Sequence, residues 1–383
     1  MLNIKSKSQC CGCSACFNIC PKDAVEMKED EYGFRYPVIN EEKCINCGLC
    51  EQKCPILKGQ ESNNNPIAFA CINKDESIRK KSSSGGIFSL VADYILENNG
   101  VVFGAAFDDK FDVKHIYAEN REELSKLRGS KYVQSSIGKS YREAKEFLDN
   151  GRKVLFTGTP CQIEGLLSYL NKEYKNLYTQ DIICHGVPSP KVWRYYKDYR
   201  KKIDNEEPKE INFRNKDTGW NNFSLNISYN GNKYSKSQRE DVYMRAFLKN
   251  ISLRDSCYEC SFKKFNRLSD VTLADFWGVK DILPDFEDDK GTSLMIVNSE
   301  KGGELFNAVK EKCKYKEVNL NGAVKYNSAF TNSVNQNKNR EKFFEQFEND
   351  DFEKLVLKYA PEDGFIKKII RKMKRAVKKV IKK

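Results

Sequence analysis

The sequence lacks the long apolar segments that mark secreted and membrane-spanning proteins. Its first ten residues, MLNIKSKSQC, contain no apolar signal-peptide core, and no run of about 18 apolar residues occurs anywhere in the chain. We therefore expect a cytoplasmic protein. Disulfides are rare in that compartment, so the 15 cysteines should be reduced and available to bind metals.

Acidic residues are missing from the end of the chain. The tail FIKKIIRKMKRAVKKVIKK (365–383) holds ten Lys and Arg, which leaves only about +2 of the net charge of +12 for the rest. The basic excess therefore does not mark a nucleic-acid-binding body, and we expect no nucleic-acid partner. Apolar residues recur in the tail at helical spacing, which predicts a C-terminal amphipathic helix over 361–383. This pattern favours peripheral binding to an anionic membrane surface at the inner face of the cell membrane over docking on a protein or binding to a polyanion.

Cysteine, by contrast, is abundant, and nine of the 15 cysteines lie in the first 57 residues. CCGCSACFNICP and CINCGLCEQKCP both contain Cys-x2-Cys-x2-Cys-x3-Cys-Pro. In bacterial ferredoxins, three cysteines of such a run bind one 4Fe–4S cluster and the fourth binds the other. We predict an α+β ferredoxin-like domain with two clusters over residues 1–57. Zinc knuckles or disulfides explain two complete and identical halves less well. The predicted ligands are Cys10, Cys13, Cys16 and Cys54 for one cluster and Cys44, Cys47, Cys50 and Cys20 for the other, with Cys11 left as a spare thiol or an alternative ligand.

Beyond a polar linker at 58–66, apolar runs alternate with helical patterns. Examples are IAFACI, SGGIFSLVADYILENN, KVLFTGTP, CQIEGLLSYLNKEY and LYTQDIIC. This alternation predicts an α/β domain with a mixed, partly parallel sheet over 67–330. INFRNK, FSLNISYNGNKYS and VTLADFWG look like added strands, with a hairpin at Asn230–Gly231. A helical extension is expected over 331–360.

Four cysteines outside the ferredoxin region are placed to form a further metal site. Cys161 and Cys184 each follow an apolar strand and precede a helix, and such strand ends converge on the ligand crevice of an open α/β sheet. Cys257 and Cys260 form a Cys-x2-Cys pair. Cys71 lies within a strand and Cys313 lies among charges, so neither is placed in this way. Four thiolates suit either structural zinc or a 4Fe–4S cluster, and fusion to an electron-carrying domain favours the cluster.

Several segments together resemble the family of beta subunits of coenzyme F-420 hydrogenases and dehydrogenases: SSSGGIFS, RGSKYVQS, GTPCQIEGL, DIICHGVPSP and CYEC followed by SDVTLADFWG. The resemblance spans about residues 67–330. It implies an iron–sulfur flavoprotein with FAD beside a third 4Fe–4S cluster on Cys161, Cys184, Cys257 and Cys260. It also implies that the loops around these cysteines form the flavin site.

The predicted flavin site includes three short segments: KSSSGG (81–86), GSKYVQS (129–135) and TGTP (157–160). KSSSGG offers small residues before a helix, which suits a phosphate, although an ordinary helix cap explains it too. The cofactor-binding candidates are Ser84, Gly85, Gly86, Ser130, Lys131, Tyr132, Gln134, Ser135, Thr157, Gly158, Thr159 and Pro160.

The catalytic candidates are Lys131, as a cation that stabilises reduced flavin, and His185. His185 directly follows Cys184 and is interpreted mainly as a hydrogen-bond partner of the cluster, with proton exchange as the alternative. The only other histidine, His115, is expected on a surface strand.

We therefore expect an oxidoreductase that passes electrons from a ferredoxin or another donor protein through the clusters to FAD and a small-molecule substrate. Because a flavin exchanges two electrons with a substrate and single electrons with a cluster, it would connect the two kinds of chemistry. Relatives with this layout suggest a role in polysaccharide biosynthesis. The alternatives are a non-catalytic electron-transfer subunit of a larger complex and a redox sensor whose central cysteines hold zinc.

Overall fold

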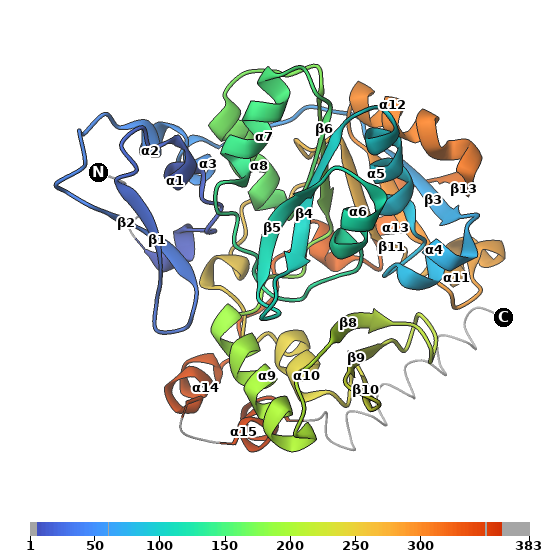
Figure 1. The fold of residues 1–383 in the computed structure, drawn as a ribbon. Helices are drawn as coiled ribbons and strands as arrows, with labels where there is room; N and C mark the ends of the chain where they lie inside the picture. The colour runs from blue at the N-terminus through green and yellow to red at the C-terminus, as the bar shows by residue number, and fades with distance from the viewer. Residues whose placement is uncertain (1–5, 60, 349–350, 362–383) are drawn as a thin grey trace.

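The N-terminal cysteines lie in a small lobe at one side of the molecule (Figure 1). The computed structural model describes residues 6–59, 61–348 and 351–361. The lobe consists of one antiparallel hairpin and three short helices, of which α1 and α2 pack together: β1 (Val25–Glu29), β2 (Arg35–Ile39), α1 (Ala15–Ile19), α2 (Leu49–Gln52) and α3 (Pro55–Lys58). Pro55 occupies the first turn of α3, where its missing N–H costs no hydrogen bond. Left-handed residues precede α1 and α2, at Ser14 and Gly48 respectively.

The main body is built on an eight-stranded mixed sheet with the order β13-β3-β12-β11-β7-β6-β4-β5. Its centre is parallel, because β4, β6, β7 and β11 run in one direction. The strands are β3 (Ile67–Asn73), β4 (Val101–Phe107), β5 (Val113–Ala118), β6 (Val154–Thr157), β7 (Leu177–Ile182), β11 (Val271–Asp275), β12 (Ser293–Val297) and β13 (Cys313–Val318).

Both faces of this sheet are covered, which explains the near-continuous apolar runs of its strands. Alternating residues of β4 point to opposite faces: Val102 packs in the core under one helical layer, and Val101 and Phe103 pack in the core under the other. Figure 1 shows α7 and α8 on the side of the ferredoxin lobe and α5, α6 and α12 on the other side. These helices are α5 (Ile87–Glu97), α6 (Arg121–Leu127), α7 (Ser140–Asp149), α8 (Pro160–Leu170) and α12 (Glu300–Val309), with the shorter α4 (Glu76–Lys81), α11 (Val279–Ile282) and α13 (Leu320–Val324) nearby.

A third part lies below the sheet in Figure 1 and has its own aromatic core. It contains a separate antiparallel sheet, order β10-β9-β8, and four helices. The elements are β8 (Glu210–Asn215), β9 (Ser224–Ser228), β10 (Lys233–Ser237), α9 (Pro190–Asp204), α10 (Val242–Leu248), α14 (Arg340–Gln346) and α15 (Phe352–Tyr359). Trp193 of α9 is fully buried in this core and packs on Phe213 and Tyr243.

The predicted mixed α/β fold behind a ferredoxin-like region is confirmed. The hairpin at Asn230–Gly231 is present, with Gly231 in the left-handed conformation that its turn requires. The strands expected from INFRNK and FSLNISYNGNKYS are present as β8 to β10, and they pair only with each other in a separate sheet. The predicted amphipathic tail falls almost entirely outside the described residues. Among the described helices, none has the length and apolar character needed to cross a bilayer.

Two arginines fasten the lobe to the body, the half-buried Arg142 and the fully buried Arg254. Arg142 of α7 donates to the carbonyls of Phe17, Asn18 and Cys20, where α1 ends. Arg254 donates from its Nε to the carbonyl of Cys10 at 2.8 Å. Carbonyls at a helix end have no partner within the helix, so Arg142 satisfies groups that would otherwise need water.

Candidate functional site

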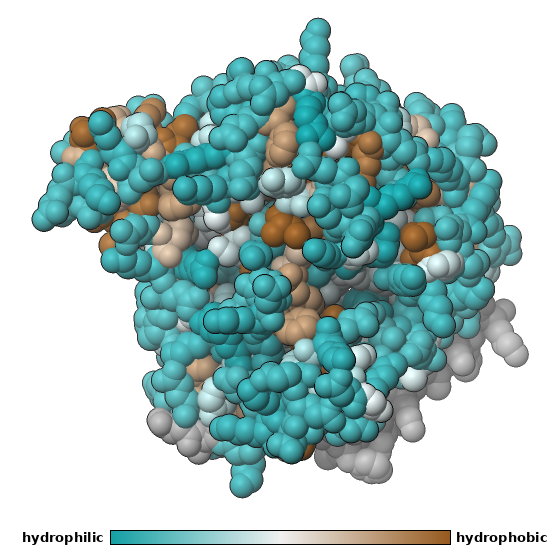
Figure 2. All heavy atoms as spheres, in the orientation of Figure 1, coloured by the Kyte–Doolittle hydropathy of each residue, from teal (hydrophilic) through white to brown (hydrophobic). Residues whose placement is uncertain are grey.

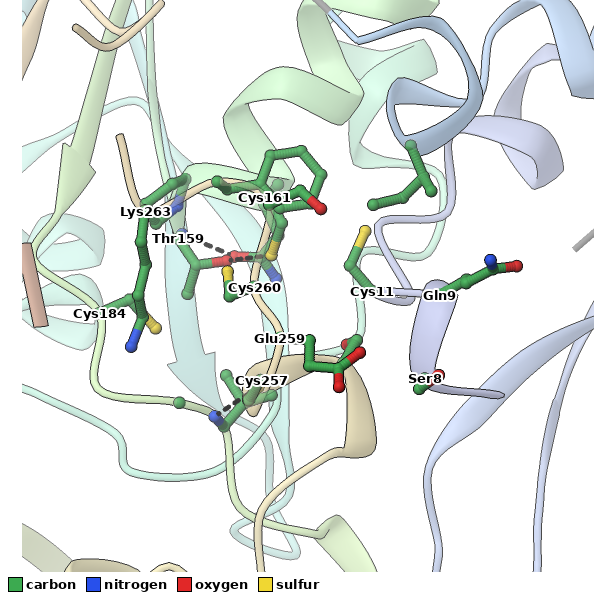
Figure 3. Close-up of a pocket in the computed structure, with 18 of the residues that line it drawn as sticks. Ser8, Gln9, Cys11, Thr159, Cys161, Cys184, Cys257, Glu259, Cys260 and Lys263 are labelled. Atoms are coloured by element: carbon green, nitrogen blue, oxygen red, sulfur yellow. Dashed lines mark hydrogen bonds between the residues drawn. The ribbon is translucent and has the colours of Figure 1, made fainter. Parts of the chain in front are cut away.

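The four central cysteines line one cavity of about 240 Å³, although they come from three separate segments. Figure 3 shows Cys161, Cys184, Cys257 and Cys260 around this cavity, with Cys11 of the ferredoxin lobe on its opposite side. The cavity lies at the carboxyl ends of β6 and β7, where an open α/β sheet places its ligands. Sequence reasoning therefore selected the residues that the fold brings together here.

Local structure holds each thiol in place. Cys161 occupies the first turn of α8, which begins with a capping box between Thr159 and Gln162. Its Sγ lies 3.1 Å from the Thr159 hydroxyl. Cys257 accepts a hydrogen bond from the backbone N–H of Val187 at 3.4 Å. Backbone donors and a helix N-terminus both favour negative charge on sulfur, as a metal-bound thiolate requires.

Without metal, these thiols are held in their neutral form. Burial raises the pKa of Cys257 to about 12 and raises that of Cys184 well above its usual value. Contact with the Cys11 thiol, followed by burial, raises the pKa of Cys161. Since a ligand must be deprotonated, metal binding at this site should release protons.

The thiols are spread around the cavity. Within the described ranges, no three Cys, His, Asp or Glu side chains converge closely enough to hold a single metal ion. A Zn²⁺ ion with Zn–S bonds of about 2.3 Å would draw its four sulfurs to within about 4 Å of one another. A four-iron cluster occupies more space and keeps its thiolates further apart.

The first predicted ferredoxin ligand set also surrounds one pocket. Cys10, Cys13, Cys16 and Cys54 all line it, and all four are buried. The second set is nearer to solvent: Cys20, Cys44 and Cys50 are half-buried and Cys47 is exposed. The two sets share the packed helices α1 and α2, which carry Cys16 and Cys50.

Two of the predicted flavin-binding segments, KSSSGG and GSKYVQS, meet at one buried arginine. Arg214 of β8 forms an ion pair with Asp275, donates to the hydroxyl of Tyr132 and donates to the carbonyl of Ser83. Ser83 in turn accepts from the backbone N–H of Ser130 at 2.8 Å. Arg214 thus joins KSSSGG, GSKYVQS and LADFWG, and its own Nε is buried without a partner. The charge and this unused donor fit an anionic cofactor.

The glycines of KSSSGG have a different explanation. A Cβ on Gly85 would lie 2.4 Å from the carbonyl oxygen of Cys71, so only glycine fits against β3. The Gly85 N–H is already bonded to the Ser293 hydroxyl at 3.0 Å. Gly86 is left-handed and stands just before α5. Close packing accounts for this glycine pair, and their role as flavin ligands stays a prediction.

A second polar chain links two of the predicted segments through His115. Its ring nitrogens lie 3.0 Å from the carbonyl oxygen of Thr157 and 3.0 Å from the Ser135 hydroxyl. Gln162 donates to Ser135 and accepts from the backbone of Thr159. The expectation of a surface position for His115 is wrong, because the ring is buried against Phe156 and bonded to Ser135. Burial lowers its pKa to about 4, so the imidazole is neutral at physiological pH.

Other flavin candidates lie at the cysteine cavity. Gln134, Thr159 and Pro160 line it. Gln134 accepts from Arg254 and donates to the Cys11 carbonyl, so it belongs to the contact between the lobe and the body. Gly158 packs against Gln162, where a Cβ would come within 3.0 Å of the amide oxygen.

The two catalytic candidates occupy different surroundings. The half-buried Lys131 donates to the carbonyls of Lys126 and Arg128 near the end of α6, and burial, then Arg128, lowers its pKa to about 7. The His185 ring hydrogen-bonds Asn250 at 2.7 Å and packs edge-on against Phe247. His185 is not among the residues that line the cavity.

Sequence reasoning missed three charged residues at these sites. Arg214 and Arg254 are nearly or fully buried, and Lys263 lines the cavity and donates to the carbonyls of His185 and Asn332. One signal was available for Arg254, which stands three residues before Cys257. Arg214 and Lys263 sit in ordinary polar stretches that nothing local distinguishes.

The fold and the cysteine pattern define an iron–sulfur redox protein, and comparison with known proteins specifies the family. A family model for the C terminus of the coenzyme F420 hydrogenase/dehydrogenase beta subunit matches residues 151–322, and the corresponding N-terminal model matches residues 68–141. A "4Fe-4S dicluster domain" model matches residues 9–56. The chain belongs to the family of coenzyme F420 hydrogenase/dehydrogenase beta subunits and carries a two-cluster ferredoxin domain in front.

Two curated relatives are similar over different spans. The chain is 27% identical over 319 residues to the "Coenzyme F420-dependent sulfite reductase" of Methanocaldococcus jannaschii, which covers 79% of this chain and 46% of that protein. It is 25% identical over 170 residues to one subunit of the F(420)H(2) dehydrogenase of Methanosarcina mazei, which covers 40% of this chain and 46% of that relative. The matched part thus spans about half the length of each.

The N-terminal region matches ferredoxins separately. It is 36% identical over 81 residues to an uncharacterised ferredoxin of Methanocaldococcus jannaschii, which covers 94% of that protein. Among solved structures, a chain of the F420-reducing [NiFe] hydrogenase complex from Methanosarcina barkeri aligns with 17% identity and a TM-score of 0.47, covering 74% of this chain and 91% of that one.

Proposed function

We propose that this protein is an iron–sulfur flavoprotein oxidoreductase. Electrons from a ferredoxin-type donor pass through the two N-terminal clusters to a third 4Fe–4S cluster, held by Cys161, Cys184, Cys257 and Cys260, and then to FAD and a small substrate, or in the reverse direction. The observation that carries the proposal is the single cavity lined by these four thiols and by Cys11 of the ferredoxin lobe. A zinc site would have no reason to adjoin the lobe that carries electrons.

The donor is proposed to dock at the outer side of the lobe. The second ligand set lies closest to solvent there, with Cys47 exposed. Figure 2 shows apolar side chains gathered over the lobe, and the exposed ones include Val38, Ile45 and Leu57. Small proteins that exchange electrons transiently form limited contacts, which such a patch can supply.

FAD is proposed to bind beside Arg214, where KSSSGG, GSKYVQS and LADFWG meet. When bound, a flavin supplies the conversion between single electrons and a two-electron reduction. Arg214 would hold and orient it, and Ser84, Ser130 and Tyr132 would shape the adjoining walls. Lys131, with its pKa lowered to about 7, would accept a proton as negative charge builds up nearby.

The first experiment is native mass spectrometry of the full chain purified without oxygen. Three 4Fe–4S clusters and one FAD are expected. Replacing Cys257 by Ser should remove one cluster and abolish flavin reduction by a reduced ferredoxin. Cys71→Ser is the control, because Cys71 is a fully buried thiol away from the cavity that contacts Cys313 in the sheet.

The rival functions give different results. Two clusters, one zinc and no flavin would establish the sensor and refute the enzyme. Three clusters and a flavin that no small electron acceptor can reoxidise would establish the non-catalytic electron-transfer subunit. Reoxidation by a deazaflavin such as coenzyme F420, the compound in the relatives' names, would identify the acceptor class.

We also propose that the basic tail holds the protein at the inner face of the membrane. The support is the sequence pattern of residues 361–383 alone. The full chain should float with vesicles that contain anionic lipid, whereas a chain ending at residue 360 and neutral vesicles should give no flotation. Equal flotation of both chains would refute this role.

A further inference from the structure

Cys11 is the cysteine that the ferredoxin motif does not use, and it stands between two metal-binding pockets. It lines the central cavity together with Cys161, and it also lines the pocket of the first ferredoxin ligand set together with Cys13. No other cysteine lines both of these pockets. Cys11 packs with Cys13 in one buried cluster, and Cys161 packs against the same cluster.

Helix α8 brings the two pockets this close. Cys161 and Gly165 stand one turn apart on α8, so they share one face of the helix. A Cβ at Gly165 would lie 2.8 Å from the Cβ and 3.1 Å from the Sγ of Cys13. The absence of that Cβ lets the first ferredoxin loop lie directly against the helix that carries a central thiol.

Cys11 itself is held rigidly. Its carbonyl accepts from Gln134, and the preceding carbonyl, of Cys10, accepts from the fully buried Arg254. Gly12 follows in a left-handed conformation, and a Cβ there would come within 3.0 Å of both Gln134 and Arg254. The position of the thiol between the pockets is therefore fixed by residues of both the lobe and the body.

We propose that Cys11 is a bridging thiol that couples the first ferredoxin cluster to the central cluster. This inference rests on the proposed function, because it requires a cluster at both sites. Cys11 is not a ligand and keeps its proton. Its S–H donates to the ligand sulfur of Cys13 or of Cys161, whichever belongs to the more electron-rich cluster.

The coupling follows from elementary electrostatics. Hydrogen bonds to cluster sulfurs help to set the reduction potential, because they stabilise the more negative, reduced form. When one electron leaves one cluster and enters the other, no covalent bond forms or breaks. The S–H bond only rotates from one sulfur to the other. Cys11 is thus a positioning residue for the electron, and a thiol is a weak donor, so the effect should be moderate.

The test compares Cys11→Ala and Cys11→Ser in the full chain, with Cys71→Ala as the control for losing a buried thiol. The reduction potentials of the clusters are measured by EPR-monitored titration, and iron is counted in each protein. Cys11→Ala should retain all iron and lower the potentials of both the first ferredoxin cluster and the central cluster, by up to about 59 mV, or tenfold in each one-electron equilibrium. Cys11→Ser keeps a hydroxyl donor and should restore most of both wild-type potentials, whereas Cys71→Ala should leave them unchanged.

Three other outcomes would overturn the inference, each in a recognisable way. Unchanged potentials in Cys11→Ala at full iron content would show that the thiol does not couple the clusters, and the proposed function would stand. Loss of one cluster in both Cys11 variants would make Cys11 a ligand. A wild-type chain with only two clusters would remove the proposed function itself, and the bridge with it.

Discussion

The guanidinium of Arg214 and the carboxylate of Asp275 form a buried two-bond ion pair, with Nη1–Oδ2 at 2.7 Å and Nη2–Oδ1 at 3.0 Å. The pair connects the small sheet, through β8, to the end of β11 in the large sheet. Trp220 donates from its indole N–H to the same carboxylate, and Arg214 stacks over Phe223. A single contact thus holds together two parts of the molecule and the predicted flavin site.

Replacing Arg214 by Ala should destabilise the protein and remove flavin. Breaking one side of a buried ion pair leaves an unpaired charge, which costs about 3–5 kcal/mol. The free energy of unfolding in urea and the flavin content would report the two effects. Arg121→Ala is the control: Arg121 pairs with Asp93 and Glu97 on the surface, where solvent screens both pairs and the loss of stability should be small. Full flavin content in Arg214→Ala would contradict the proposed position of the cofactor.

Gly165→Ala should separate the ferredoxin lobe from the body. An alanine normally stabilises a helix by about 1 kcal/mol over glycine, but here its Cβ would overlap Cys13 and the hydroxyl of Tyr141. We expect slower electron transfer from the lobe to the central cluster and easier proteolysis between them. The matched control is Gly303→Ala in α12, which has open space around its Cβ position and should be stabilising. Equal behaviour of the two variants would refute the close contact of lobe and helix.

Lys263→Gln should lower the reduction potential of the central cluster. Its positive charge lies in the cavity wall and favours the deprotonated forms of Cys184 and Cys260. The same charge favours a reduced cluster, so its removal should shift the one-electron potential downward by an amount on the order of 59 mV. EPR-monitored titration measures this shift. Lys145→Gln, on the surface of α7, should leave the potential unchanged; an upward or absent shift in Lys263→Gln would argue against a cluster in this cavity.

Glu164 should make the folded state less stable as the pH rises. Burial raises its pKa to about 7, above the value near 4.3 of an unfolded chain. Between about pH 4.5 and pH 7 the folded protein therefore holds a proton that the unfolded chain has released. The free energy of unfolding falls as the pH rises through this range. Urea unfolding of wild type and Glu164→Gln at pH 5 and pH 8 tests the linkage. The variant should lose less stability than wild type between these two pH values, and equal losses would show that Glu164 ionises normally.

The ferredoxin domain was predictable because its signal is local. The spacing of the two Cys-x2-Cys-x2-Cys-x3-Cys-Pro runs predicts which cysteines share a cluster. One predicted set lines a single pocket: Cys10, Cys13, Cys16 and Cys54. The central cysteines were predictable for a related reason. Cys161 and Cys184 follow apolar strands, and parallel strands end at a common edge of the sheet.

The pairing of strands was harder to infer than the strands themselves. The strand pattern around His115 is compatible with either a surface or a buried ring. Side chains alternate between the two faces of a strand, and the pattern does not show which face other elements cover. Packing of the ring on Phe156 and its bond to Ser135 decided it. Likewise, the alternation of apolar and polar residues in β8 to β10 does not show that these strands form a separate sheet.

The sequence by itself indicated the grouping of the cysteines and the mixed α/β body, since these follow from spacing and periodicity along the chain, and its resemblance to known proteins indicated the family. Only the tertiary structure decided what lies between the sites. Cys11 reaches Cys161 across 150 positions, Arg254 reaches Cys10 across 244, and Arg214 collects three segments around one guanidinium. Such contacts depend on how helices and sheets pack on each other, and no local pattern encodes the partner of a buried charge.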